Sequence, residues 1–285
     1  MRNKTVSVII PTYNEERDIS ECLNSLKKQA LKNLEIIVVD DGSKDKTIER
    51  IKKFKRIKII KGQHKGPGFS RNLGARSAKG DILVFIDADM VFDKDYLKNL
   101  INPLIKNKKI IGATHDFEIA NNVDNIWSKC WGKIRVSKEN AKKDSKVFRA
   151  IRKDKFLSFG GFDPKYGYAD DQTFWFKYKI KPTVAKNTTC YHKNPETLKE
   201  VYKQSRWIGA SIENSFTETP IIKYFYPLIL VILSPLAIVL LSLKRCYKNK
   251  NFRLLFPWMF IFMISRYFGT IKGIINKIYF NKNVR

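Results

Sequence analysis

The sequence predicts an α/β fold with a mostly parallel central sheet, followed by an apolar C-terminal region, and three observations carry this prediction. Over residues 5–106, short β-branched runs alternate with longer polar segments of helical periodicity. The runs are apolar throughout, which is typical of strands that are buried on both faces of a parallel sheet. Residues 220–285 differ from the rest, because they contain long apolar stretches in place of this alternation.

Predicted strands and helices alternate in the first part of the chain. In residues 16–29, for example, Ile19, Cys22 and Leu26 fall on one face of a helix. Alternation at this spacing predicts βαβ units with right-handed crossovers. The predicted strands are residues 6–10, 35–39, 57–60 and 82–86, and the predicted helices are residues 16–29, 45–54, 67–77 and 94–106.

Residues 110–219 are less regular, and fewer elements are predicted in them. Residues 110–119 and 146–151 are expected to form further strands, and residues 126–140 are expected to form a helix. Residues 159–164 contain two Gly and a Pro, so we expect a turn there.

The C-terminal region is predicted to associate with a membrane. Residues 224–243 contain no charge over 20 positions, enough to cross a hydrocarbon core of about 30 Å. Residues 254–271 form a second apolar segment. We therefore expect one domain over residues 1–219 and a membrane-associated region over residues 220–285.

Two arrangements of this region stay open. If the first segment crosses the membrane, the basic residues within 244–253 lie outside, against the positive-inside tendency. An interfacial or re-entrant hairpin, bent near Pro235, would instead keep both of its ends on the cytoplasmic side.

The composition excludes several classes of protein. With 285 residues, of which 44% are hydrophobic, the chain is not disordered and can bury a full core. Its four Cys lie far apart without CxxC spacing, which argues against a zinc ribbon, a thioredoxin-like centre or a disulfide scaffold. The first ten residues hold too short an apolar run for a signal peptide. The net charge of +28 favours nucleic acid, anionic lipid or a phosphorylated substrate as partner, without choosing among them.

Polar segments follow three of the predicted strands, at residues 11–15, 40–43 and 87–89. Because parallel strands end at one edge of a sheet, and ligands bind beyond that edge, we expect these segments to meet around a ligand. Asp87 and Asp89 follow a buried strand, and carboxylates at this spacing can hold Mg²⁺ or Mn²⁺ together with a diphosphate. An isolated pair of this kind is usually a solvated turn, but the apolar strand before it favours the metal site.

Two other segments have the chemistry of a nucleotide site. Asp41 can accept hydrogen bonds from a nucleobase, while Gly42 permits a close approach of ligand to backbone. Residues 65–72 contain neither GxGxxG nor GxxxxGK[ST], which disfavours a dehydrogenase or a P-loop NTPase. Lys65 and Arg71 in this segment are positioned to meet phosphates.

Five segments then occur in one order, namely VSVIIPTYNEE, VVDDGSKDKT, GPGFSRNLGARSAKGDILVFIDADM, GGFDP and ADD. Together they resemble a family 2 glycosyltransferase over about residues 5–215, and the agreement of all five in order and spacing makes the resemblance specific. It implies the GT-A nucleotide-diphospho-sugar transferase fold, with a mostly parallel, Rossmann-like sheet, followed here by C-terminal hydrophobic membrane helices. It also implies an inverting, commonly metal-dependent enzyme that uses UDP- or GDP-linked sugars.

The resemblance implies a donor-binding role for residues at the strand ends. Asp41 would read the base, and Asp87 would face the ribose or the sugar. Asp89 would hold Mg²⁺ or Mn²⁺, with Asp87 and His192 as further candidate ligands of the metal. The other donor-binding residues implied are Pro11, Thr12, Tyr13, Glu15, Lys65, Arg71 and Arg206.

Two adjacent acids are the candidate catalytic residues. A pair of carboxylates can supply a general base, because each charge raises the pKa of its neighbour. The resemblance implies that Asp171 is this base, in the second position of the family's Glu-Asp pair, where Asp170 replaces the usual Glu. Residues 203–207 partly resemble the QxxRW motif of processive polysaccharide synthases, with Lys in the first position, and Trp207 would stack on an acceptor sugar.

The predicted function is transfer of a sugar from a nucleotide-diphosphate donor to a lipid-linked or membrane-proximal acceptor hydroxyl. The expected setting is cell-surface glycan biosynthesis at the cell membrane, with the catalytic domain on the cytoplasmic side and membrane lipid as a partner. Nucleotidyl transfer onto a sugar phosphate is one alternative, but it calls for a glycine-rich basic loop where PTYNEE stands. A basic nucleic-acid-binding protein is another, and the acids at the strand ends argue against nucleic acid as a partner.

Overall fold

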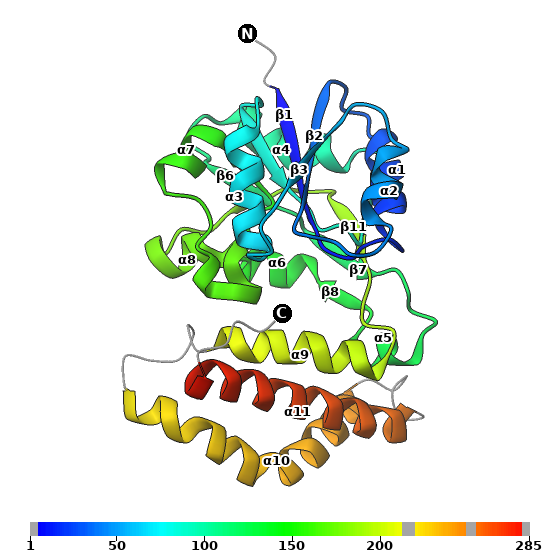
Figure 1. Cartoon of the computed structure of the whole chain (residues 1–285), viewed down its shortest axis with the longest axis vertical. Coiled ribbons are helices and arrows are strands. Elements are labelled where there is room, and N and C mark those ends of the chain that lie inside the picture. The colour runs from blue at the N-terminus through cyan, green and yellow to red at the C-terminus, as the bar shows by residue number, and fades with distance from the viewer. Residues whose placement is uncertain (1–4, 213–219, 249–254, 281–285) are drawn as a thin grey trace. The chain divides into compact units, whose positions relative to one another are not determined.

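The computed structural model describes residues 5–212, 220–248 and 255–280 (Figure 1). The chain forms two compact units. The first comprises Met1–Ile119, Ile134–Pro164 and Asp170–Lys193, and the second comprises Ala120–Lys133, Lys165–Ala169 and Asn194–Arg285. The predicted boundary after residue 219 falls outside the described residues and stays a prediction.

The central sheet of the first unit has the strand order β10-β6-β9-β4-β1-β2-β3. Its strands β4, β1, β2 and β3 are parallel neighbours, which confirms the predicted α/β fold with a mostly parallel sheet. The strand β9 runs antiparallel between β4 and β6. The bounds of the sheet are β1 Val6–Thr12, β2 Leu34–Asp40, β3 Ile57–Lys61, β4 Ile82–Phe85, β6 Gly112–Thr114, β9 Ala150–Arg152 and β10 Thr183–Val184.

Both faces of this sheet are covered, which is why the middle of β1 is apolar on both of its faces. Val8 and Ile10 belong to a core with Leu23 and Leu100, on one face. Ile9, between them in β1, belongs to the core on the other face, because successive side chains of a strand alternate. The four helices predicted between the strands are confirmed as α1 Ile19–Lys27, α2 Thr47–Lys52, α3 Pro67–Ser77 and α4 Tyr96–Lys106.

A second sheet of four strands, ordered β5-β11-β7-β8, corrects two predictions. Residues 110–119 form two strands in different sheets rather than one. The single helix predicted at residues 126–140 is wrong, because Gly132, with a φ of 122°, ends the first helix, and Ile134 then pairs with Ile119. A new helix starts after Ser137, whose Oγ accepts a bond from the Asn140 N–H. The elements are β5 Met90–Phe92, β7 Phe117–Ala120, α5 Ile126–Trp131, β8 Ile134–Val136, α6 Lys138–Asp144 and β11 Thr189–His192.

The turn predicted at residues 159–164 is confirmed. Gly160 and Gly161 have φ values of 81° and 76°, a conformation that favours glycine. Phe162, after them, packs into a cluster of aromatic rings with Phe156 and Phe174. The elements around this turn are α7 Lys153–Ser158, the 3₁₀ segment η1 Pro164–Gln172 and α8 Thr173–Tyr178.

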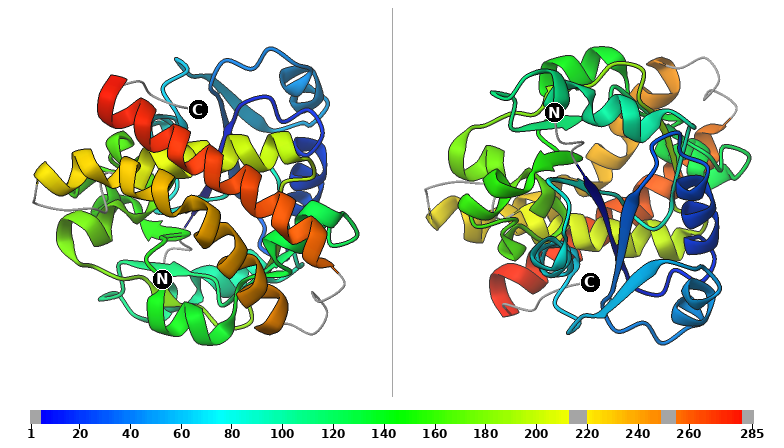
Figure 2. Two further views of the ribbon diagram at one scale, coloured as in Figure 1. Left: turned by 90° about the horizontal axis from the view of Figure 1, so that it is seen from below. Right: turned by 90° about the horizontal axis from the view of Figure 1, so that it is seen from above.

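The second unit is helical, with α11 lying between α9 and α10 (Figures 1 and 2). The two predicted apolar segments are helical wherever they are described, and both helices are long and apolar enough to cross a membrane. The start of the second segment, at residue 254, lies outside the described residues. The three long helices are α9 Leu198–Ile212, α10 Pro220–Lys248 and α11 Phe256–Phe280.

Candidate functional site

The carboxyl ends of β1, β2 and β4 meet at one edge of the central sheet. Thr12 at the end of β1 pairs with Asp40 at the end of β2. Asn14 then turns the chain with a φ of 57°. Its N–H donates to Ser43 Oγ at 2.9 Å, and its side-chain oxygen accepts from the Lys44 N–H at 2.8 Å. The two polar segments that follow β1 and β2 are therefore tied together.

Asp41 is buried and holds the loop before α3. Its two carboxylate oxygens accept the N–H groups of Lys65 and Gly66 at 3.1 and 2.9 Å. The Tyr13 ring lies 4.6 Å from the ring of His64, whose Nδ1 is 3.0 Å from the Asp41 carbonyl oxygen. The structure thus places an aromatic pair beside the backbone of Asp41, the residue that we expect to read a base. Sequence reasoning missed His64, which has a φ of 54° in an irregular loop.

Other predicted donor-binding residues lie around this edge. Pro11 and Thr12 are buried, and Thr12 Oγ1 donates to the Val39 carbonyl oxygen at 3.2 Å. The Lys65 ammonium lies 5.1 Å from the centre of the Phe69 ring in α3. The roles predicted for these three side chains toward a donor stay predictions.

Arg71 in α3 joins two acidic segments that are far apart in sequence. Its Nη2 is 2.6 Å from Asp87 Oδ1, and its Nη1 bonds Asp170. Arg149 Nη1 lies 3.1 Å from the other Asp87 oxygen. Burial would raise the pKa of Asp87, but Arg149 and Arg71 hold it well below its ordinary value. Asp87 is therefore an ionised carboxylate clamped between two guanidinium groups.

Asp170 and Asp171 differ in their surroundings. Asp170 is only 1% exposed, and a Cβ atom on Gly68 would lie 2.7 Å from its Oδ2, so glycine is needed beneath it. Asp171 is half-buried, and no hydrogen bond or ion pair reaches its carboxylate from the described part of the chain. Burial raises the pKa of both acids, that of Asp170 to about 7, against the opposing charge of Arg71. One acid is therefore fixed, and its neighbour is available to take a proton.

Asp89 is linked through His192 to Glu118 in the four-stranded sheet. His192 in β11 lies with its Nε2 at 3.1 Å from Asp89 Oδ1 and its Nδ1 at 2.7 Å from Glu118 Oε1. Glu118 in β7 also pairs with Arg135 at 2.9 Å. Burial and Arg135 lower the pKa of His192, but Asp89 and Glu118 raise it to about 9 overall. In this arrangement the imidazole is protonated and donates to both carboxylates.

Several carboxylates around Asp89 act electrostatically on one another. Burial raises the pKa of Glu15 well above its ordinary value, and the charges of Asp89, Asp18 and Asp87 raise it further. Such a concentration of negative charge, made of oxygen donors, suits Mg²⁺ or Mn²⁺. Both oxygens of Asp87 are paired with arginines, and one oxygen of Asp89 is paired with His192, so the metal-binding role of Asp89 stays a prediction.

A second group of metal-binding atoms lies deeper in the first unit. The ligand atoms of His115, Glu118 and Cys190 are within 4.8 Å of one another, and all three residues are buried. However, Glu118 already pairs with Arg135 and lies 4.0 Å from Arg149. These two cations disfavour a metal ion there, and the group is better described as a hydrogen-bonded network.

Arg149, Arg135 and Glu118 are the charged residues that sequence reasoning missed. Arg149 did carry a signal, because it is a charge inside the apolar segment 146–151, which was predicted to be a strand. Arg149 lies directly before the buried strand β9, and a buried charge needs an opposite charge nearby; Asp87 is that partner.

Arg206 and Trp207 belong to the second unit, on α9. The Trp207 ring lies edge-on to the Tyr168 ring at 5.0 Å. The donor contact predicted for Arg206 and the acceptor contact predicted for Trp207 stay predictions.

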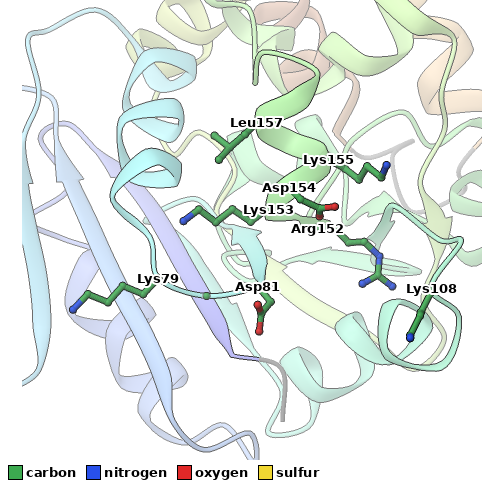
Figure 3. A pocket seen from close by; sticks show the side chains of 9 residues that line it. Lys79, Asp81, Lys108, Arg152, Lys153, Asp154, Lys155 and Leu157 are labelled. Carbon is green, nitrogen blue, oxygen red and sulfur yellow. The ribbon is translucent and has the colours of Figure 1, made fainter. Parts of the chain in front are cut away.

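A cavity of about 580 Å³ lies elsewhere on the first unit, at the amino end of β4 (Figure 3). It is lined by basic and acidic side chains, but none of the predicted site residues is among them. The Arg152 guanidinium, at its edge, donates to the carbonyl oxygens of Ile110 and Asn107 at 2.8 and 3.1 Å. This cavity is thus at the opposite end of the strand from the Asp87 and Asp89 carboxylates.

Comparison with solved structures identifies the fold. A mannosyltransferase from Pyrobaculum calidifontis, in complex with GDP-Man and Mn²⁺, superposes with a TM-score of 0.62 at 18% identity, covering 98% of this chain and 88% of its own. Staphylococcus aureus TarS in complex with UDP-GlcNAc gives a TM-score of 0.56 at 18% identity, covering 95% and 91%. This likeness confirms the GT-A fold that the motifs implied.

Comparison with other sequences identifies the family. An uncharacterised glycosyltransferase of Haemophilus influenzae is 28% identical over 185 residues, which are 62% of this chain and 63% of that protein. The poly(ribitol-phosphate) beta-N-acetylglucosaminyltransferase TarS of S. aureus is 38% identical over 100 residues, 33% of this chain and 18% of that protein. The match thus spans less than two thirds of either relative. The family model of glycosyl transferase family 2 matches residues 7–163, more than half of the chain, and the chain belongs to that family.

Proposed function

We propose that the protein is an inverting glycosyltransferase that moves a sugar from a nucleoside diphosphate donor to an acceptor hydroxyl, with Asp171 as its general base. One observation carries this proposal, namely the contrast between Asp170, fixed by Arg71, and Asp171, whose carboxylate has no bond within the described residues. A base must have a free lone pair and a pKa near the working pH, and burial moves the pKa of Asp171 in that direction.

The donor would lie along the strand ends of the first unit. Tyr13 and His64 offer aromatic surface for a base, and Asp41 lies directly beside them. Lys65 and Arg71 are the proposed phosphate contacts, and Pro11, Thr12 and Glu15 complete the nucleoside side. A donor linked to UDP or GDP is supported by the fold neighbours, which were solved with UDP-GlcNAc and GDP-Man.

A divalent metal would be held by Asp89, with His192 and Asp87 close to it. Mg²⁺ or Mn²⁺ supplies, when bound, the positive charge that stabilises a departing nucleoside diphosphate. The fold neighbour from P. calidifontis was solved with Mn²⁺. For Nε2 of His192 to become a ligand, that nitrogen must lose its proton, because only a neutral imidazole nitrogen binds a metal.

The reaction would be a single displacement in which the residues of this chain move one proton. The acceptor oxygen forms a bond to the anomeric carbon as the bond to the diphosphate oxygen breaks, and Asp171 takes the hydroxyl proton. Arg71 fixes Asp170 and Asp87 at once, so the base is held at a constant distance from the sugar side of the site. Attack from the face opposite the leaving group inverts the anomeric configuration.

The acceptor is proposed to be lipid-linked or membrane-proximal, at the cytoplasmic side of the cell membrane. Two apolar helices in the second unit support this assignment. Arg206 is proposed to contact the donor diphosphate, and Trp207 to stack on an acceptor sugar, because residues 203–207 partly resemble the QxxRW motif.

A panel of nucleotide sugars with Mg²⁺ or Mn²⁺ tests the proposal. We expect release of UDP or GDP from one donor, and we expect Asp171→Asn to lower turnover by about 10²–10⁴-fold with donor binding retained. Asp154→Asn, an exposed carboxylate in the first unit, is the matched control and should turn over normally. Unchanged turnover in Asp171→Asn would remove this residue as the base. Release of pyrophosphate in place of a nucleoside diphosphate would indicate nucleotidyl transfer instead.

A further inference from the structure

We propose that the second unit attaches to the membrane from one side only, with α10 embedded among the lipid acyl chains and neither α10 nor α11 crossing the bilayer. This inference rests on the proposed membrane association. It adds that the helices attach to one side of the membrane and do not span it. It follows from which side chains α10 buries, and from how α11 packs on α9.

In a helix of a water-soluble protein the apolar side chains are buried and the polar ones are exposed, whereas α10 exposes most of its apolar side chains. Its buried residues Ser234, Ile238, Ser242 and Cys246 recur every four positions and form one narrow face. Both serine hydroxyls bond to carbonyl oxygens of α10 itself, at 2.7 Å. The exposed side is aliphatic, comprising Leu228, Ile229, Val231, Ile232, Leu233, Leu236, Val239, Leu240, Leu241 and Leu243.

Lipid is the partner whose chemistry matches this exposed side. Soluble proteins expose single, scattered apolar residues, whereas α10 exposes a continuous apolar surface. No Asp or Glu occurs in residues 220–285, whereas Lys and Arg recur there. Lys244, directly after the last exposed leucine, is itself exposed. An apolar face bordered by positive charge fits acyl chains beneath anionic headgroups.

The helices α9 and α11 are parallel and in direct contact. Ser265 Oγ donates to the Leu198 carbonyl oxygen at 3.0 Å. One turn further along both helices, a Cβ atom on Gly269 would lie 2.5 Å from the Tyr202 carbonyl oxygen. After another turn, a Cβ atom on Gly273 would lie 1.9 Å from the Arg206 carbonyl oxygen. Because each step advances four residues on both helices, the two backbones touch over at least two turns.

This contact argues against a transmembrane α11. Residues 265–273 are the middle of that helix, and α9 covers them. The side chains of Lys199 and Lys203 on α9 are exposed, and Glu200 is half-buried. If α11 crossed the bilayer, these charges would lie at the depth of the hydrocarbon core, where ionised side chains are strongly disfavoured.

The packing of α10 on α11 extends the argument to α10. Ile238 and Cys246 of α10 share one buried core with Met259 and Phe262 of α11 and with Val201 of α9. The three helices are therefore layers of one body, with α11 in the middle (Figure 2). In Figure 1, α10 is also bent, and Pro235 within it removes a backbone hydrogen bond. The three packed helices can therefore attach to a membrane with α10 in the lipid and α9 on the side of the water.

Cysteine labelling tests the topology in the full-length chain expressed in bacterial cells. The four native cysteines are buried, so background labelling by a membrane-impermeant maleimide should be low. Tyr247→Cys reports the end of α10, where the side chain is 79% exposed, and Lys44→Cys reports the first unit. We expect both to be labelled in inverted vesicles and protected in right-side-out vesicles. Labelling of Tyr247→Cys from the side opposite to Lys44→Cys would show that α10 crosses, and would overturn the proposal.

A second pair of variants tests whether α10 is the part in contact with lipid. The double variant Ile232→Lys, Leu236→Lys should lose at least tenfold in partitioning to phosphatidylglycerol-containing vesicles. Ile105→Lys, at another exposed apolar position, in α4, should partition like the unchanged protein. Unchanged partitioning of the double variant would also overturn the proposal.

Donor turnover measured in the same preparations separates the two proposals. If nucleoside diphosphate is released but Tyr247→Cys labels from the far side, only the topology is wrong. If labelling is as expected but no donor is turned over, the proposed function fails and the topology stands.

Discussion

The first unit and the C-terminal helices place charge and apolar surface in opposite ways. In the first unit, the buried Arg71 is paired with the buried Asp170 and with the half-buried Asp87 at one edge of the central sheet. In α10, leucines and isoleucines cover the outside while two serines face inward. In the first unit apolar side chains are buried and a few paired charges lie at one edge of the sheet, whereas α10 exposes its apolar side chains, as a helix in contact with lipid would.

The largest effect should come from breaking the buried charge cluster. Arg71→Met leaves Asp170 without a cationic partner and leaves Asp87 with Arg149 alone, and breaking a buried pair such as Arg71–Asp170 costs about 3–5 kcal/mol. The matched control is Lys177→Met, which removes a partly exposed pair with Asp163 at 2.7 Å and should cost about 1 kcal/mol or less. Denaturant unfolding in detergent measures both. Equal losses in the two variants would mean that the Arg71 cluster is not part of the buried framework.

The pH dependence of activity should sharpen the assignment of the base. Burial raises the pKa of Asp170 to about 7 and raises that of Asp171, so the pair takes up a proton as the pH falls through this range. Because the base must be ionised, and because burial raises its pKa, kcat/KM should fall as the pH is lowered from 8 towards 5, by up to about tenfold for each pH unit. The measurement is the rate of nucleoside diphosphate release between pH 5 and 8 at saturating metal. A flat profile down to pH 5 would contradict a raised pKa at the catalytic carboxylate.

Features that depend on residues close together in the chain could be predicted from the sequence, whereas contacts between distant residues could not. The strand ends were predictable, because polar residues directly follow apolar runs in the chain. Arg149 was not, since it reaches Asp87 only through the antiparallel β9, a neighbour of β4 that is distant in sequence. The link from Asp89 to Glu118 likewise depends on β11 pairing in the second sheet.

The C-terminal helices show the same limit. Length and hydropathy predicted the helices themselves, because these are local properties. The register of α9 against α11 was not predictable, because it depends on which glycines meet which carbonyl oxygens after folding. The wrong helix at residues 126–140 has the same cause, since Ile134 leaves the helical pattern to pair with a strand.

A smaller effect should come from the contact between α9 and α11. Gly273→Ala would bring a methyl group to 1.9 Å from the Arg206 carbonyl oxygen, so the helices must separate, at about 1–3 kcal/mol. Thermal unfolding in detergent measures the loss. Alanine is the better helix former by about 1 kcal/mol, so a net stabilisation would show that the two backbones do not touch.

The smallest effect on stability is expected at Leu236 of α10, and it tests the comparison most directly when the same chemical change is also made at Leu100 of α4. Leu100→Ala removes a fully buried side chain of α4 and should cost about 2–5 kcal/mol in unfolding free energy. Leu236→Ala removes a side chain of α10 that is 61% exposed, and in detergent it should change the unfolding free energy by about 0.5 kcal/mol or less. Its effect should appear instead as weaker partitioning to lipid vesicles, by severalfold, since less apolar surface is buried there. A loss of stability as large as that of Leu100→Ala would mean that protein, and not lipid, covers this face of α10.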